Sequence, residues 1–442
     1  MARRNFYEWY ADHIDSGFRR VGLHPGEKPT PGEVKALLLV GIAVMVNHYD
    51  QGIYGLALPR IQEGLGIAEA DVGRFSAILA VAIFPAFFVA FLADSVGRRR
   101  LLMITLALTA FFTGASAFAE NAASFYALQF SARIFANAED MLAAVMVVEA
   151  MRPQLRGWAI GALAAMGAAG HGLAAGVYAT VDVLPLDWRA LYIIGAVPML
   201  LAVWLRRGLE ESEIFEAARA ERLASKRSLG VQMADALRPI KLLFTAYPKR
   251  LAALAAALLP FTMGVTSSLA FMPKLLQDTH GYSPLQVSLL FLAGGTFAIC
   301  GNLLAGRIAD NIGRKTVLVA AGSIAALGGV YGYLWATGPA LVICWMVTLF
   351  AFFAASTSVA ALTGEIFPTS YRATASAMRG LIGAVGAGIG LMLQSELYEI
   401  TGNHAEAIVW LLALVPVGMV ATLLFLPETA GRNLEDIAPE VA

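Results

Sequence analysis

The stretch DNIGR at residues 310–314 repeats the stretch DSVGR at residues 94–98, with an aspartate, a glycine and an arginine in the same register. A second pair of residues shares this offset of 216 positions, because Glu149 and Glu365 each stand seven residues before an arginine. Self-similarity at one constant offset indicates an internal structural repeat. The sequence therefore predicts two parallel copies of one unit, and these copies decide the fold.

Long apolar runs fill the sequence around these repeats. Hydrophobic residues make up 58% of the chain and charged residues 14%, with a mean hydropathy of +0.66, whereas a soluble domain carries about 25% charged residues. A membrane-spanning helix needs roughly 20 apolar residues. Such runs lie near 35–58, 72–93, 101–119, 122–151, 157–181, 189–206, 249–273, 284–309, 315–336, 339–366, 373–400 and 404–426. We expect an all-α integral membrane protein with twelve transmembrane helices in two pseudo-symmetric six-helix halves.

The charge balance and the cysteines exclude several classes of protein. Lys and Arg number 32, as do Asp and Glu, so no net field attracts nucleic acid. The two cysteines lie inside apolar runs and form neither a disulfide framework nor a metal site. We see no nucleophile triad and no phosphate-binding loop. We therefore expect no enzyme, no cofactor and no metal, and as partners a small-molecule substrate and the lipid bilayer.

Lys and Arg residues follow the second, fourth, sixth, eighth and tenth apolar runs. Cytoplasmic loops are the ones rich in these residues, so both termini are expected in the cytoplasm of a cell with a bacterial-type inner membrane. We expect a monomer with five parts. These are an amphipathic segment at 1–34, a first half at 35–207, a linker at 208–248, a second half at 249–427 and a tail at 428–442.

Three motifs carry a family resemblance. GRIADNIGRK at 306–315 is similar to the loop motif of the major facilitator superfamily, and its first copy differs by an alanine at position 90. EIFPTSYR at 365–372 and PETAGRNLE at 427–435 resemble the branch that holds sugar porters, metabolite–proton symporters and organic-ion transporters. The resemblance implies transport by alternating access, through a cavity lined by the first and fourth helices of each half.

The repeated motifs are expected to act as a gate. The turns at Gly97 and Gly313 need a tight backbone, and the acids and arginines around them can cap neighbouring helix ends. Contacts that exist only when the cytoplasmic side is closed would favour an outward-open state; the alternative is static loop packing. The expected gating residues are Asp94, Gly97, Arg98, Glu149, Arg156, Asp310, Gly313, Arg314, Glu365 and Arg372.

Polar residues inside the first run are expected to face a cavity. Asn47, Asp50 or Gln51, and Tyr54 recur at helical spacing and share one face. Asp50 lies roughly 22 Å from the start of the run, at 1.5 Å per residue. A carboxylate in apolar surroundings can bind a proton near neutral pH, as a proton-coupled carrier requires. The alternative is a structural acid that is tied to its neighbours.

The fourth run holds Arg133 and Glu139, which are unusual at membrane depth. In the similar proton–sugar symporters an acid in the first helix pairs with an arginine in the fourth, so Asp50 and Arg133 resemble that pair, although the arginine is about one helical turn nearer to Glu149 than in that family. Glu139 resembles a second acid of some metabolite–proton symporters, and either acid can carry the proton. Arg133 either pairs with these acids or binds a substrate carboxylate.

Three further residues stay open. Asp140 points about 100° away from Glu139 on a helix, and no role follows from this. His171, in the fifth run, is a packing residue or a cavity residue, and the same alternatives hold for His48. With Asn47, Gln51, Tyr54 and Arg133, His171 completes the candidate substrate-binding set.

The function expected from these residues is proton-coupled transport of a small organic anion, with uptake by symport. The alternatives are a carrier of a neutral sugar, polyol or organic cation, an efflux carrier, or a membrane sensor or scaffold that does not transport.

Overall fold

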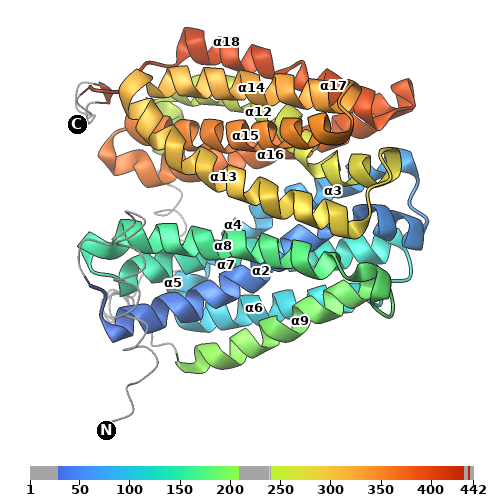
Figure 1. Ribbon diagram of the computed structural model, residues 1–442. Helices are drawn as coiled ribbons and strands as arrows, with labels where there is room; N and C mark the ends of the chain where they lie inside the picture. The colour runs from blue at the N-terminus through green and yellow to red at the C-terminus, as the bar shows by residue number, and fades with distance from the viewer. Residues whose placement is uncertain (1–27, 209–237, 239, 433–436, 439–442) are drawn as a thin grey trace. The chain divides into compact units, whose positions relative to one another are not determined.

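The computed structural model describes residues 28–208, 238, 240–432, 437 and 438 of the chain (Figure 1). Every regular element in these ranges is helical. Most of the amphipathic segment expected at 1–34, most of the expected linker and part of the expected tail fall outside the described residues. The side chain of Asp94 also falls outside them.

The described helices divide into two compact units. The first comprises Met1–Ala57 and Ala82–Lys226, and the second comprises Leu58–Val81 and Arg227–Ala442. Helix α2 (Pro31–Leu65) therefore contributes to both. The segment 58–81, which the sequence places in the first half, belongs by its contacts to the second unit. A compact unit and a sequence repeat are different divisions, so the half boundaries expected from the sequence stay a prediction.

The first unit continues from α2 with helices that include the third and fourth apolar runs. They are α4 (Ile83–Phe91), α5 (Ala93–Val96), α6 (Arg98–Ser116), α7 (Ala122–Ala150), η2 (Pro153–Leu155), α8 (Arg156–Tyr178), η3 (Val181–Val183), α9 (Trp188–Leu205) and η4 (Arg206–Gly208). Helix α6 packs against both α7 and α9, and α7 also contacts α4 and α8.

The second unit contains the remaining helices. They are η1 (Glu69–Asp71), α3 (Val72–Ala80), α12 (Pro248–Lys274), the π-helix η5 (Leu275–Thr279), α13 (Pro284–Ile312), α14 (Arg314–Leu334), α15 (Gly338–Ile366), η6 (Thr369–Tyr371), α16 (Arg372–Thr401), α17 (His404–Leu412) and α18 (Val415–Phe425). Helix α15 packs against α13 and α14, while α12 packs against α16 and α18 (Figure 1).

Local sequence explains where the two helices that carry the polar residues begin. At α2 the Thr30 hydroxyl accepts from the backbone N–H of Glu33 at 3.3 Å, and the Glu33 carboxylate accepts from the N–H of Thr30 at 2.7 Å. At α7 the Asn121 side chain accepts from the N–H of Ser124 at 2.9 Å. Such reciprocal caps satisfy backbone donors that have no partner inside the helix.

Ten helical segments of the described residues are long and apolar enough to cross a membrane. Two of the twelve expected spans are not among them, α6 with 19 residues and α7 with 29. Helix α6 begins with three arginines and α7 carries Arg133, Glu139 and Asp140, and these residues lower the hydropathy of both. Charged residues inside a spanning helix are often functional, so α7 is a candidate to carry the site.

The repeated loop motifs adopt the same backbone in both units. Gly97 has φ 105° and ψ 136°, and Gly313 has φ 106° and ψ 141°. These φ values lie in the region that favours glycine. The expected tight turns at the two glycines are confirmed, and both copies of the motif have the same backbone conformation at this position.

Candidate functional site

Small residues let α8 lie against α2 inside the first unit. A Cβ atom at Gly170 would overlap the carbonyl oxygen of Met45, and one at Gly167 would lie 3.2 Å from the imidazole ring of His48. Because both positions lack a Cβ, the His48 ring fits between the helices. It stands edge-on to the ring of His171 with 5.2 Å between the centroids.

Asp140 on α7 is the centre of a polar cluster. Its carboxylate accepts hydrogen bonds from the Asn47 amide at 3.0 Å and the Gln51 amide at 3.4 Å. The Nδ1 atom of His48 lies 3.9 Å from the same carboxylate. The structure thus gathers Asn47, Gln51 and His48 beside an acid whose role the sequence left open, and His171 packs against His48. Angle counting along α7 alone did not reveal this, because the partners come from α2.

Tyr54, one turn further along α2, lies elsewhere in the first unit. Its hydroxyl is 3.1 Å from the hydroxyl of Tyr126 on α7. The structure therefore does not place Tyr54 with Asp140, although the two share helices with the polar cluster.

Asp50 is fully buried, and its carboxylate is short of partners. Neither oxygen makes a hydrogen bond to any described residue, although Thr113 and Gln129 lie near it and Arg133 is the cation that acts on it. The Arg133 guanidinium makes one long hydrogen bond, 3.4 Å to the carbonyl of Gln51, while its buried Nε has no partner among the described residues. Both charges therefore keep unused bonding capacity.

Glu139 pairs with Arg206 rather than with Arg133. The two charged groups are 2.8 Å apart and both side chains are 0% exposed. Arg206 also donates to the carbonyls of Leu39 and Val40 at 3.2 and 3.1 Å. The sequence interpretation missed this partner because Arg206 stands at the end of an apolar run, where an arginine also marks topology. No spacing rule links residues this far apart in the chain.

The repeated motifs form equivalent ion pairs, one inside each unit. Arg98 pairs with Glu149 in the first unit. In the second, Arg314 pairs with Glu365 at 2.6 Å and with Asp310 at 2.8 Å. These contacts lie within single units, so a role in closing the cytoplasmic side stays a prediction.

The remaining motif arginines bind differently. Arg156 donates to the carbonyls of Val148 and Met151 near the end of α7. The buried Nε of Arg372 has no hydrogen-bond partner among the described residues. Neither arginine is therefore shown to pair with the glutamate seven residues before it.

Glu428, which follows α18, caps the start of α14. Its carboxylate accepts from the backbone N–H groups of Arg314 at 2.8 Å and Lys315 at 3.1 Å. Burial raises the pKa of Glu428, but these bonds and those from Ala430 and Thr429 outweigh it and hold the pKa below the ordinary 4.5. The tail motif therefore acts as a helix cap.

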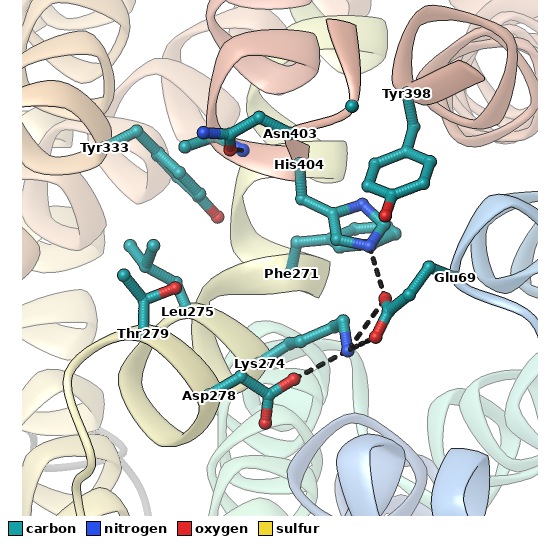
Figure 2. Close-up of a pocket in the computed structure, with 12 residues that line it drawn as sticks. Glu69, Phe271, Lys274, Leu275, Asp278, Thr279, Tyr333, Tyr398, Asn403 and His404 are labelled. Carbon is teal, nitrogen blue, oxygen red and sulfur yellow. Dashed lines mark hydrogen bonds and ion pairs between the residues drawn. The ribbon is translucent and has the colours of Figure 1, made fainter.

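A pocket of about 250 Å³ lies inside the second unit (Figure 2). Figure 2 shows Lys274 of α12 pointing at Glu69 and Asp278, and its ammonium nitrogen is 3.1 and 2.6 Å from their carboxylates. It also donates to Gln62 at 2.6 Å. All three ammonium donors are satisfied, so this cation stabilises the second unit and is not open to a ligand.

Beside Lys274, His404 completes the contacts of Glu69. The Nε2 atom of His404 is 2.7 Å from the Glu69 carboxylate, and its ring stacks on Tyr398 with 4.2 Å between centroids (Figure 2). Arg74 of α3 pairs with Glu396 and Glu399 of α16 at 2.7 and 2.8 Å. These ion pairs explain why residues 58–81 belong to the second unit. In the part of the chain that the structure describes, no His, Cys, Asp and Glu side chains converge to hold a metal ion.

Comparison with known proteins places the chain among transporters. The family model of the Major Facilitator Superfamily matches residues 40–310 and 254–440. A metabolite transport protein of Haemophilus influenzae is 26% identical over 91% of this chain and 98% of its own length. The 4-hydroxybenzoate transporter of Pseudomonas aeruginosa is 24% identical over 89% and 93%.

A solved structure has the same fold. The xylose transporter from E. coli in an inward-open conformation superimposes with a TM-score of 0.72 at 17% identity, over 91% of this chain and 98% of that one. At this identity the similarity shows the fold alone.

Proposed function

We propose that this chain, which belongs to the Major Facilitator Superfamily, couples the transport of a small organic anion to protons. Its family and relatives make it a multi-pass membrane transporter of small molecules and not an enzyme. The anion and the proton are our proposal, as are uptake by symport, a monomer, an inner-membrane location and cytoplasmic termini.

The observation that carries the proposal is the incomplete bonding of Asp50 and Arg133. A charge at membrane depth is costly unless it is paired or hydrated. Asp50 has no hydrogen bond among the described residues and Arg133 has one long one, so each can exchange partners. When a proton neutralises Asp50, Arg133 loses its counter-charge and a substrate carboxylate replaces it. A monocarboxylate and a proton then move together without net charge.

The arginine is suited to this exchange. Its guanidinium is planar and binds a carboxylate through two parallel N–H donors. A relative named for 4-hydroxybenzoate, an aromatic carboxylate, supports an anionic substrate here as well. We propose that the site is shaped by three residues that lie near Arg133 or Asp140, namely Asn47, Gln51 and His171. We also propose that Tyr54, which contacts Tyr126, lines the site.

For Glu139 we propose a structural role, because it forms a buried ion pair with Arg206 at 2.8 Å. For the repeated motifs we propose that the pairs Arg98–Glu149 and Arg314–Glu365 stabilise the state that is closed on the cytoplasmic side. Arg156, Arg372, Asp94 and Asp310 belong to the same proposed gate.

A binding screen tests the sign of the substrate. The purified chain in detergent is heated with a panel of monocarboxylates, the matching amides, sugars and organic cations. We expect carboxylates to raise the melting temperature and the amides to have no effect. Arg133→Lys should weaken carboxylate binding at least tenfold, about 1.4 kcal/mol, because one ammonium cannot reproduce the two-pronged contact. The exposed Arg207→Lys is the control.

Two results would overturn the organic-anion proposal. One is stabilisation by sugars or cations alone. The other is a carboxylate that binds Arg133→Lys as tightly as the parent protein.

A further inference from the structure

Arg133 and Asp140 stand on one face of α7. They are seven residues apart, which is about two helical turns, so their Cα atoms are offset by roughly 20° around the helix and about 10 Å along it. Arg133 acts electrostatically on Asp140 and also on His171. The first unit therefore presents a cation and an acid on one helix face, with His48 near the acid and the ring of His171 packed against that of His48.

Asp140 keeps acceptor capacity on its accessible side. An ionised carboxylate offers about four acceptor positions, and the structure fills two of them, with the Asn47 amide at 3.0 Å and the Gln51 amide at the long distance of 3.4 Å. The side chain is 29% exposed, unlike that of Asp50, which is fully buried. Asp140 can therefore receive a further donor from outside.

The neighbouring histidine does not use up this capacity. The Nδ1 atom of His48 is 3.9 Å from the Asp140 carboxylate, beyond hydrogen-bond distance, and it bonds the carbonyl of Val44 at 2.9 Å. A ligand group at Asp140 thus meets an acceptor. It is bound if it donates a hydrogen bond and is repelled if it is a second anion.

We infer that the substrate carries a hydrogen-bond donor at the end opposite its carboxylate, and that Asp140 binds this donor while Arg133 binds the carboxylate. This inference rests on the proposed function and names the class of substrate within it, a hydroxy or amino monocarboxylic acid. The Cα atoms of Arg133 and Asp140 are about 10 Å apart along α7, so we choose probes of small-molecule length, a single ring or a chain of about five bonds, that carry a carboxylate at one end and a donor at the other.

The test uses benzoates that differ only in the para group. A hydroxyl donates a hydrogen bond, a fluorine of similar size does not, and a second carboxylate adds a charge; 5-hydroxypentanoate and pentanoate form a matched open-chain pair. Binding to the full-length purified protein is measured by calorimetry. We expect each hydroxy acid to bind at least tenfold more tightly than its partner without the donor, and the dicarboxylate to bind most weakly.

Asp140→Asn is the diagnostic variant. Its amide oxygen can keep the bond from Asn47 while its NH₂ group replaces the acceptor. We expect the preference for hydroxyl over fluorine to fall to twofold or less, with little change for the fluoro compound. Arg133→Lys should instead weaken all monocarboxylates alike. Glu120→Gln, an exposed acid before α7, is the control and should behave as the parent does.

The outcomes distinguish a failure of the inference about the donor from a failure of the proposed anion transport. If monocarboxylates bind without preference for a donor, if hydroxy acids fail to bind while other carboxylates do, or if Asp140→Asn keeps the hydroxyl preference, the inference is wrong and anion transport stands. If Asp140→Asn abolishes pH-driven accumulation of every substrate, Asp140 is a coupling acid and the inference is also wrong. If no carboxylate binds the parent, both this inference and the proposed function fail.

Discussion

Arg206→Met removes the only partner that the described residues give to the Glu139 carboxylate. The guanidinium is 2.8 Å from that carboxylate, and both side chains are 0% exposed. After the substitution the acid stays buried without a counter-charge, while the carbonyls of Leu39 and Val40 lose a donor.

The magnitude follows from the burial. Removing one member of a buried ion pair costs about 3–5 kcal/mol, because the other charge remains uncompensated. The lost bonds to the carbonyls of Leu39 and Val40 add little to this cost, because carbonyls inside α2 keep their helical hydrogen bonds. Replacing both charges with apolar side chains of similar volume is often close to neutral. We therefore expect Arg206→Met and Glu139→Met each to lose about 3–5 kcal/mol, and the double variant to be more stable than either.

The assay is SDS-induced unfolding in micelles, followed by tryptophan fluorescence. Arg207→Met is the matched control, because Arg207 is exposed and surface substitutions change stability by about 0.5 kcal/mol or less. The reasoning is refuted if Arg206→Met behaves like Arg207→Met, or if the double variant loses the sum of the single losses. If the double variant folds but no longer accumulates substrate with a pH gradient, Glu139 and not Asp50 carries the coupled proton.

Three further predictions concern the cap, the helix contact and the pocket. Glu428→Gln should lose about 1 kcal/mol of stability at neutral pH. Because the pKa of Glu428 in the folded protein lies below 4.5, its stabilisation is present above pH 4.5 and is lost as the pH falls through the folded pKa. The unfolding free energy of the variant, measured across this range, should lack that pH dependence. Gly170→Ala should cost about 1–3 kcal/mol of stability and weaken substrate binding in the thermal-shift screen, because α2 and α8 must separate. Gly176→Ala, where the added Cβ meets open space, should be neutral or slightly stabilising. Equal effects of the two substitutions would contradict the close contact between α2 and α8. Lys274→Met should lower stability in the SDS assay by only about 1–2 kcal/mol, because its acidic partners are half-exposed and their charges are screened. A loss no larger than that of the exposed Lys249→Met would show that the ion pairs of the pocket do not stabilise the second unit.

The sequence predicts features that are set by neighbouring residues or by the repeat. The five-residue motif predicts tight turns at Gly97 and Gly313, and both residues have positive φ values. The caps at Thr30 and Asn121 are set equally locally, although they are not among the features predicted above. Hydropathy predicts the helices, and only α6, with its three arginines, and α7, with its charged residues, are missing from the ten apolar spans of the described residues.

Contacts between distant segments cannot be predicted from the spacing of residues in the sequence. Asp278 lies four residues after Lys274, so this pair can be read along a helix, but Gln62 and Glu69 reach the same ammonium from another part of the chain. The helical angle between Asp140 and Glu139 predicts no role for Asp140, because its partners Asn47 and Gln51 lie on α2 and only packing brings them together.

The direct test of proton-coupled anion transport is uptake by Asp50→Asn in proteoliposomes. The screen described above supplies the carboxylate, and accumulation is measured with and without an inward proton gradient, alongside exchange at equal pH. The amide mimics the protonated acid, so we predict that gradient-driven accumulation is lost while exchange continues. Accumulation by Asp50→Asn equal to that of the parent protein would contradict the coupling role of Asp50.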